Sequence, residues 1–195
     1  DDLDPETEDT YELGFGVRFL PAFTGQITYF YRETKDSIIS PYGLSAKTFN
    51  TDKAINRGAE IQLKYDFGRG SYLSVNYVQI DPDQPALIQP ERMGNAVTNW
   101  RMNRYLNLNV HCLYRGDWNR KSYIAQYEDP RDDLDDYVIV NTKLTVRQFF
   151  PGIDGLELGL SVFNLFDEEY YEPSTYNQGL PGDFPLPGRN FLVEL

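Results

Sequence analysis

The sequence predicts an all-β fold, an antiparallel barrel that crosses a membrane with its strands, and three observations lead to it. Apolar and polar residues alternate with a period of two in segment after segment, which is typical of a strand with one apolar face. The connections between these segments alternate between short and long. Aromatic residues make up 15% of the chain, and they are favoured on the pleated surface of a sheet.

The first two segments, 11–19 and 25–33, are predicted to form a hairpin. Pro21 and Ala22 interrupt the alternation between them, and so short a break brings two antiparallel strands side by side. The polar face of the first strand includes Glu12 and Arg18. The apolar face of the hairpin is formed by Tyr11, Leu13, Phe15, Val17, Phe19, Ile27, Tyr29 and Tyr31.

A second hairpin is predicted from segments 59–67 and 73–77. Gly68 and Gly70 flank Arg69 between them, and glycine is common in tight turns because it adopts positive φ without strain. The apolar face again contains every second residue, namely Ala59, Ile61, Leu63, Tyr65, Phe67, Leu73, Val75 and Tyr77.

Five further segments complete the series: 96–100, 106–114, 137–147, 156–162 and 191–195. The segment 96–100 has the weakest alternation. With these the sequence contains about nine strands and no credible helix. Their apolar positions include Leu106, Leu108, Val110, Cys112, Tyr114, Val138, Val140, Leu144, Val146, Leu156, Leu158, Leu160, Val162, Phe191, Val193 and Leu195.

The lengths of the connections indicate which kind of all-β fold this is. The short ones are 20–24, 68–70, 101–104 and 149–155, and the long ones are 40–53, 81–92, 116–136 and 167–186. Bacterial outer-membrane barrels combine short periplasmic turns with long external loops. The same count places the C-terminus on the periplasmic side.

Composition excludes several other classes. The net charge of −12 argues against a nucleic-acid surface, which needs a basic stripe to neutralise phosphates. The mean hydropathy is −0.53, and no run approaches the roughly 18–20 apolar residues of a membrane helix. Cys112 is the sole cysteine, so neither a disulfide framework nor a Cys-rich metal cluster is predicted. The acidic first nine residues do not resemble a signal peptide, so we expect either that the chain starts after processing or that the N-terminal portion of the protein precedes it.

Two other classes of all-β protein remain open at this point. A soluble antiparallel sandwich also alternates apolar and polar residues, but it would not have connections of alternating length. A passive porin would have both features. The polar face contains charges, amides and glycines in strand after strand, and the apolar face ends in tyrosines and phenylalanines typical of interfacial girdles, which favours a membrane barrel over a sandwich.

Four motifs in order resemble one family, the TonB-dependent outer-membrane receptors, and within it the siderophore receptors. Residues 162–170 read V-F-N-L-F-D-E-E-Y and residues 187–195 read P-G-R-N-F-L-V-E-L, like the last two strands of that barrel; residues 56–61 and 31–39 resemble its G-x-E strand opening and Y-x-x-x-x-D-x-I strand end. The residues that carry the motifs, to which we assign a structural role, are Gly58, Glu60, Asn164, Leu165, Phe166, Asp167, Tyr170, Pro187, Gly188, Arg189 and Phe191.

The resemblance implies a barrel of about 22 strands with a plug domain in its lumen, located in the bacterial outer membrane. This chain, residues 1–195, would then be the C-terminal part, about the last nine strands. An open sheet leaves unpaired edges, which are costly in hydrocarbon, so the plug and the earlier strands are expected outside this chain. The family usually ends on an aromatic residue, whereas this chain ends on Leu195, so we expect a few residues beyond it.

The resemblance also implies a function and partners. External loops would bind a scarce nutrient, most often an iron chelate, with cobalamin, haem or a sugar as alternatives. The TonB complex would energise import through a segment absent here, and outer-membrane lipid would surround the barrel. No cofactor is expected.

Some of the motif residues can be interpreted without the family. Asn164 and Asp167 are turn formers because their side chains bond nearby backbone groups, and Gly188 is expected to tolerate positive φ. The aromatic residues beside them are predicted to lie at the outer rim, in a girdle or in loop packing; they are Phe163, Phe166, Tyr170 and Tyr171.

The sequence predicts no catalytic residue. His111 has no partner motif and is expected on the polar wall. The two long loops 116–136 and 167–186 are candidate ligand lips, since loops on a rigid scaffold commonly carry binding. Clustered carboxylates in the first loop suit calcium, but their spacing is not that of an EF-hand, so no metal site is predicted. The aromatic lip candidates are Trp118, Tyr123, Tyr127, Tyr171 and Tyr176.

Overall fold

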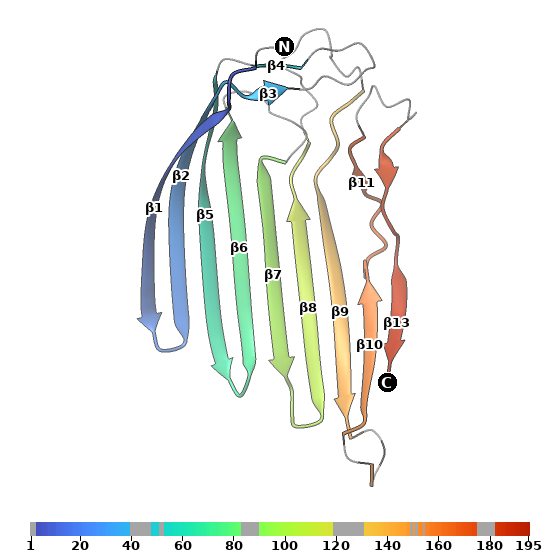
Figure 1. Ribbon diagram of the computed structural model, residues 1–195. Coiled ribbons are helices and arrows are strands. Elements are labelled where there is room, and N and C mark those ends of the chain that lie inside the picture. Colours follow the sequence, from blue (N-terminus) through green and yellow to red (C-terminus); the bar gives the residue numbers. More distant parts are fainter. Residues whose placement is uncertain are drawn as a thin grey trace.

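The computed structural model describes residues 3–39, 48–50, 53–82, 90–118, 131–148, 150, 152–153, 155–174 and 182–195. Its main feature is one nine-stranded sheet (Figure 1) with the order β1-β2-β5-β6-β7-β8-β9-β10-β13, in which every paired neighbour is antiparallel. The strands are β1 (Thr7–Leu20), β2 (Phe23–Lys35), β5 (Lys53–Gly68), β6 (Ser71–Pro82), β7 (Arg92–Arg101), β8 (Leu106–Arg115), β9 (Tyr137–Arg147), β10 (Glu157–Phe163) and β13 (Asn190–Glu194).

The sequence-based prediction of an all-β fold is confirmed, and each expected strand segment corresponds to one strand of the sheet. Two small ribbons were not predicted. One pairs β3 (Ile38–Ile39) with β4 (Phe49–Asn50), and the other pairs β11 (Tyr171–Glu172) with β12 (Phe184–Pro185). Among the described residues, no helix is long and apolar enough to cross a membrane.

The connections segregate by length to the two ends of the sheet. The strand ends that the short ones join, after β1, β5, β7 and β9, all lie at the lower end in Figure 1, whereas the strand ends joined by the long ones lie at the upper end. We call these the short-connection end and the long-connection end. The β5–β6 turn shows why short turns suffice: Gly68, Arg69 and Gly70 have φ of 79°, 56° and 81°, and the Asp66 carboxylate accepts a hydrogen bond of 2.7 Å from the Gly68 amide.

The strand register places the alternating apolar residues on one continuous face. Tyr11 pairs with Tyr31, and Ile61 pairs with Tyr77. Many side chains on this apolar face are exposed, most strongly in β1, with Leu13 at 77% and Phe15 at 67%. Among the described residues, the only buried hydrophobic ones are Tyr137 and Ile139. The described part of the chain therefore does not cover this apolar face, and large exposed apolar patches mark contact with a membrane or a partner.

Aromatic rings border this apolar face at both ends. Near the short-connection end, the rings of Phe19 and Phe23 lie 5.5 Å apart and those of Tyr65 and Phe67 lie 4.8 Å apart. Near the long-connection end, Tyr11 contacts Tyr31 at 6.4 Å. Two such borders are typical of the interfacial girdles of membrane barrels.

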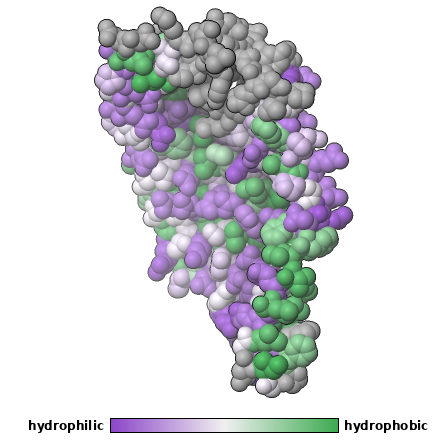
Figure 2. All heavy atoms as spheres, turned by 45° about the vertical axis from the view of Figure 1, so that its right-hand side comes forward, coloured by the Kyte–Doolittle hydropathy of each residue, from purple (hydrophilic) through white to green (hydrophobic). Residues whose placement is uncertain are grey.

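The opposite face of the sheet is polar. Amide side chains bond across neighbouring strands, Asn76 to Asn95 at 3.2 Å and Asn107 to Asn99 at 2.9 Å. Figure 2 shows hydrophilic residues spread over much of the visible surface and hydrophobic residues gathered at its lower right. His111 is on the polar face as predicted. Its register partners are Val97, which lies between Asn95 and Asn99 on that face of β7, and Asn141, which shares that face of β9 with Lys143.

An ion pair spans three strands of this polar face. The Lys143 ammonium in β9 lies 2.5 Å from a carboxylate oxygen of Glu194 in β13, although β10 lies between these strands. Gly159 of β10 makes this possible: a Cβ there would lie 3.2 Å from both Lys143 Cε and Glu194 Oε2. The missing side chain thus leaves room for the bridge.

Candidate functional site

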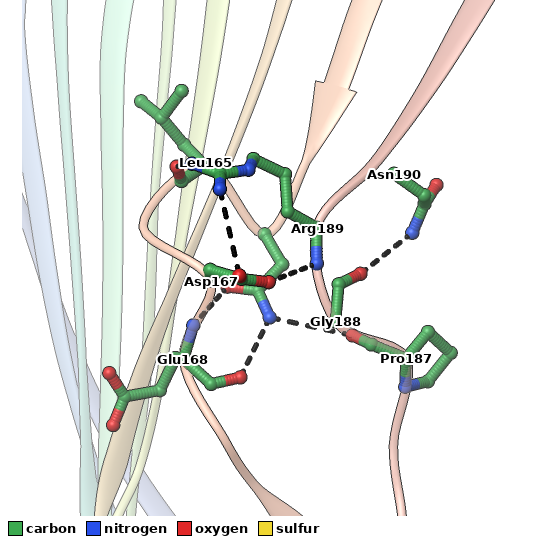
Figure 3. Close-up of polar contacts among 8 residues, drawn as sticks. Leu165, Asp167, Glu168, Pro187, Gly188, Arg189 and Asn190 are labelled. Atoms are coloured by element: carbon green, nitrogen blue, oxygen red, sulfur yellow. Dashed lines mark hydrogen bonds and ion pairs between the residues drawn. The ribbon is translucent and has the colours of Figure 1, made fainter.

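The two C-terminal motifs come together at the long-connection end of β10 and β13 (Figure 3). We call residues 164–168 and 187–190 the C-terminal clasp. The clasp is fixed to β9 by two backbone amides: that of Asn164 donates to the Asn141 side chain at 2.9 Å, and that of Leu165 donates to the Val140 carbonyl at 2.8 Å. The chain after β10 is therefore held against the neighbouring strand.

Asn164 is the centre of the clasp. It has φ of 51°, a left-handed conformation that asparagine tolerates better than most residues. Its Oδ1 accepts from the Glu168 amide at 2.9 Å, and its Nδ2 donates to the carbonyls of Glu168 at 2.8 Å and Pro187 at 3.4 Å. One side chain thus closes the turn and joins it to the segment before β13.

Asp167 forms the second link. Its Oδ1 accepts from the Arg189 amide at 2.7 Å, and its Oδ2 lies 3.6 Å from the Arg189 guanidinium. The guanidinium in turn donates to the Leu165 carbonyl at 3.4 Å. Like Asn164, Asp167 has positive φ, 60°, so the prediction that both are turn formers is confirmed.

Gly188 was expected in a turn because glycine tolerates positive φ, and this reason was wrong. Gly188 is not among the described glycines with positive φ. Its role is close approach, because a Cβ at this position would lie 3.1 Å from the Asp167 carboxylate oxygen. A side chain there would crowd the carboxylate that holds the Arg189 amide.

The motif at residues 56–61 also has a visible packing reason. Gly58 pairs with Phe30 in the register of β2 and β5, and a Cβ on Gly58 would lie 2.5 Å from Phe30 Cζ and would also meet the carbonyl oxygen of Gln79. Glu60 lies on the same polar face and accepts from the Gln62 side chain at 2.7 Å. Gly58 therefore leaves space for an aromatic ring on the polar face.

The aromatic residues around the clasp take different positions. The Tyr170 ring packs on Tyr137 at 4.9 Å, and burial, with a smaller contribution from the Glu172 carboxylate, raises the pKa of Tyr170. Phe166 is 71% exposed and Tyr171 is 41% exposed. Phe191 pairs with Val162 on the apolar face.

Of the five lip candidates, the structure describes Trp118 and Tyr171; Tyr123, Tyr127 and Tyr176 lie outside the described residues. Trp118 pairs with Leu134 through backbone bonds of 2.9 and 3.3 Å, which close the base of the β8–β9 loop. Within the part of the chain that is described, no group of three or more His, Cys, Asp or Glu side chains could hold a metal ion.

A contact that sequence reasoning missed joins the two candidate lips. The Arg131 guanidinium, from the β8–β9 loop, donates to the Ser174 hydroxyl at 2.9 Å and to the Ser174 carbonyl at 2.7 Å, and pairs with Asp183 at 3.4 Å. We call Arg131, Ser174 and Asp183 the cross-loop node. No local sequence pattern predicts the cross-loop node, because the partners of Arg131 are 43 and 52 residues away in the sequence.

Comparisons with known proteins agree with this geometry. The family described as TonB dependent receptor-like, beta-barrel, matches residues 1–165. The ferric-catecholate import receptor Fiu from E. coli K12 superimposes with a TM-score of 0.73 at 18% identity, covering 98% of this chain and 27% of that chain. No curated protein matches in sequence.

Two further solved structures are similar. The ferric enterobactin receptor PfeA from Pseudomonas aeruginosa, a Q482A mutant in complex with enterobactin, gives a TM-score of 0.75 at 22% identity, with 96% of this chain and 31% of that chain covered. The siderophore receptor PirA from Acinetobacter baumannii gives a TM-score of 0.73 at 18% identity, with 98% of this chain and 32% of that chain covered.

The chain thus spans about a third or less of the length of these structures. The family match ends within the clasp, but the structural matches extend over nearly the whole chain and include the last strand region. The family is one of receptors and not a class of enzymes. By its sequence match over most of its length and by its fold, the chain belongs to the TonB-dependent receptor family and forms part of the receptor's β-barrel.

Proposed function

We propose that this chain is the C-terminal part of a bacterial outer-membrane receptor that binds an iron chelate and imports it with energy from the TonB complex. The plug domain, the segment that contacts TonB and the earlier strands would belong to the remainder of the receptor. The observation that carries the proposal is the combination of an exposed apolar face with a sheet whose strand ends, at one end, are those joined by the long connections.

The apolar face has the dimensions that a membrane requires. In β1 the stretch from Tyr11 to Phe19 matches the length of a membrane-crossing strand, roughly 9–11 residues. β1 itself has 14 residues and β5 has 16, so both strands extend beyond this band at the long-connection end. Since external loops of such barrels are the long ones, this end would face the outside.

The external end would hold the ligand. We propose that Trp118 and Tyr171, with Tyr123, Tyr127 and Tyr176, supply aromatic contacts to the chelate. Aromatic side chains offer large, rigid contact area. The proposal of an iron chelate is supported by the similar structures, which are those of a ferric-catecholate import receptor, a ferric enterobactin receptor and a siderophore receptor.

The direct test uses the full-length receptor in bacterial cells. Expressed in a strain that lacks its own catecholate receptors, it is expected to support growth with ferric enterobactin as the sole iron source, and deletion of TonB is expected to abolish that growth. Growth that persists without TonB at high chelate concentration would instead indicate passive diffusion through a porin.

A binding measurement separates the ligand from the mechanism. Quenching of tryptophan fluorescence in the purified receptor by ferric enterobactin, a ferric hydroxamate, haem and cobalamin would rank the chelate classes. Tyr171→Ala is expected to weaken binding of the preferred ligand several-fold, whereas Phe184→Ala, across the β11–β12 ribbon from the neighbouring Glu172, serves as the matched control. Equal affinity in both variants and the parent would remove Tyr171 from the proposed lip.

A further inference from the structure

The cross-loop node is unusually complete for a contact between two loops. Arg131 makes three contacts in the node. In addition, the Ser174 amide donates to Asp183 Oδ1 at 3.1 Å, and the Ser174 hydroxyl donates to the Gly182 carbonyl at 2.7 Å. Ser174 is only 2% exposed. Every polar group of Ser174 thus has a partner, and the Asp183 carboxylate is shared by the two loops.

The chemistry of the node requires arginine. One guanidinium reaches a hydroxyl, a carbonyl and a carboxylate, which its fork of N–H donors allows. A lysine ammonium is a point charge on a flexible stem and would not span the same three acceptors. The side chains of Arg131 and Asp183 are only 20% and 14% exposed, so solvent screens their attraction less than that of surface pairs.

The position of the node gives it a wider effect than a local loop contact. Arg131 lies three residues before Leu134, whose bridge to Trp118 closes the β8–β9 loop. Ser174 and Asp183 lie directly beyond the β11–β12 ribbon, which is itself closed by the Leu186 amide bonding the Tyr170 carbonyl at 3.0 Å. The node therefore joins the bases of both loops.

We propose that Arg131 is a positioning residue that fastens the bases of these two external loops together, so that the two bases hold one fixed arrangement. Trp118 at the base of one loop and Tyr171 at the base of the other then keep a constant separation. The external location rests on the proposed function, whereas the mechanical link between the loops does not.

The test measures the separation of the two loops directly. In the full-length receptor, Cys112→Ser removes the only cysteine of this chain, and any cysteines in the rest of the receptor are replaced likewise. Spin labels are then attached at Asp135→Cys and Glu172→Cys, both exposed positions. Pulsed electron resonance in lipid vesicles should give one narrow distance distribution for the parent and a distribution at least twice as broad for Arg131→Gln.

Two further variants make the result specific. Arg131→Lys is expected to broaden the distribution nearly as much as Arg131→Gln, because charge alone does not satisfy the node. Asp183→Ala tests the link from the other loop, and it provides an independent answer if the Arg131→Gln receptor does not assemble. Assembly of each variant is checked by the heat-modifiable mobility of the folded barrel in electrophoresis.

The matched control is Arg92→Gln. Arg92 pairs with Asp117 at 2.7 Å at the base of the same loop, but the pair is exposed and joins that loop to β7. Its loss should leave the distribution unchanged. An unchanged distribution in Arg131→Gln and Asp183→Ala, or equal broadening by Arg92→Gln, would overturn the proposal. Because no ligand is involved, this outcome is independent of whether the receptor binds ferric enterobactin.

Discussion

The ring of Phe30 in β2 occupies the space that a side chain at Gly58 in β5 would need. The two residues are direct partners across the strands, and a Cβ on Gly58 would lie 2.5 Å from Phe30 Cζ. The glycine of the family's G-x-E motif is thus explained by an aromatic neighbour on the polar face.

Gly58→Ala is therefore expected to destabilise the barrel by about 1–3 kcal/mol, the usual cost of overpacking a close contact. Urea unfolding of the intact receptor in lipid vesicles would measure it. In a Phe30→Ala background the same substitution should cost less, but not nothing, because the Gln79 carbonyl oxygen also meets the added Cβ. An equal cost in both backgrounds would contradict the role assigned to the ring.

Asn164→Ala should weaken the C-terminal clasp. The substitution removes three side-chain hydrogen bonds and places alanine at a φ of 51°; each such hydrogen bond contributes about 0.5–1.5 kcal/mol. Asn190→Ala is the control, since its amide makes one bond, to the Gly188 carbonyl. A drop in the urea midpoint is expected for Asn164→Ala only, and matching midpoints would show that the clasp does not limit stability.

Asp167 allows the charge to be separated from the geometry. Asp167→Asn keeps an Oδ1 acceptor for the Arg189 amide and tolerates positive φ, so it should remain close to the parent in stability. Asp167→Ala loses both the acceptor and the tolerance of positive φ. It should clearly lower the midpoint temperature at which the heat-modifiable mobility of the folded barrel is lost. Because the ion pair is about half exposed, its charge contributes little. A loss in Asp167→Asn as large as in Asp167→Ala would assign the effect to the charge.

Gly159→Ala is predicted to weaken the bridge between Lys143 and Glu194. The added Cβ would lie 3.2 Å from atoms of both side chains, so each must shift by a few tenths of an ångström. If the bridge is what the glycine protects, Gly159→Ala and Glu194→Gln should each lower the unfolding midpoint, and the double variant should be little worse than either. Fully additive losses in the double-mutant cycle would show that Gly159 serves another purpose.

The sequence predicted the strands well where one face is apolar, and less well elsewhere. β5 begins at Lys53, before the predicted segment 59–67, because Lys53 and Arg57 stand at positions of the apolar face and the alternation disappears there. β7 has ten residues, whereas only 96–100 was evident. Its apolar face contains Gly94, Ala96 and Thr98, which are too small to give a clear contrast.

The candidate site was predictable in part. Motif residues such as Asn164 and Asp167 were identified as turn formers, but their partners in β9 and before β13 could not be, since hydrogen bonds between distant segments have no sequence period. The cross-loop node was missed for the same reason. Its Arg131 lies within a run of charged residues, where one buried guanidinium is indistinguishable from its solvated neighbours.

The exposure of the apolar face has a consequence for evolution. In a globular protein, apolar side chains interlock, and a change of one methylene group disturbs the neighbours. Here residues such as Leu13 and Phe15 project from the sheet, and in the proposed membrane setting they would meet fluid acyl chains that adapt to any shape. Leucine, valine and phenylalanine should therefore be freely interchangeable at such positions, whereas polar-face glycines such as Gly58 and Gly159, which lie close to neighbouring side chains, should not be replaceable. Selection on this chain would then act on hydrophobicity on one face and on shape on the other.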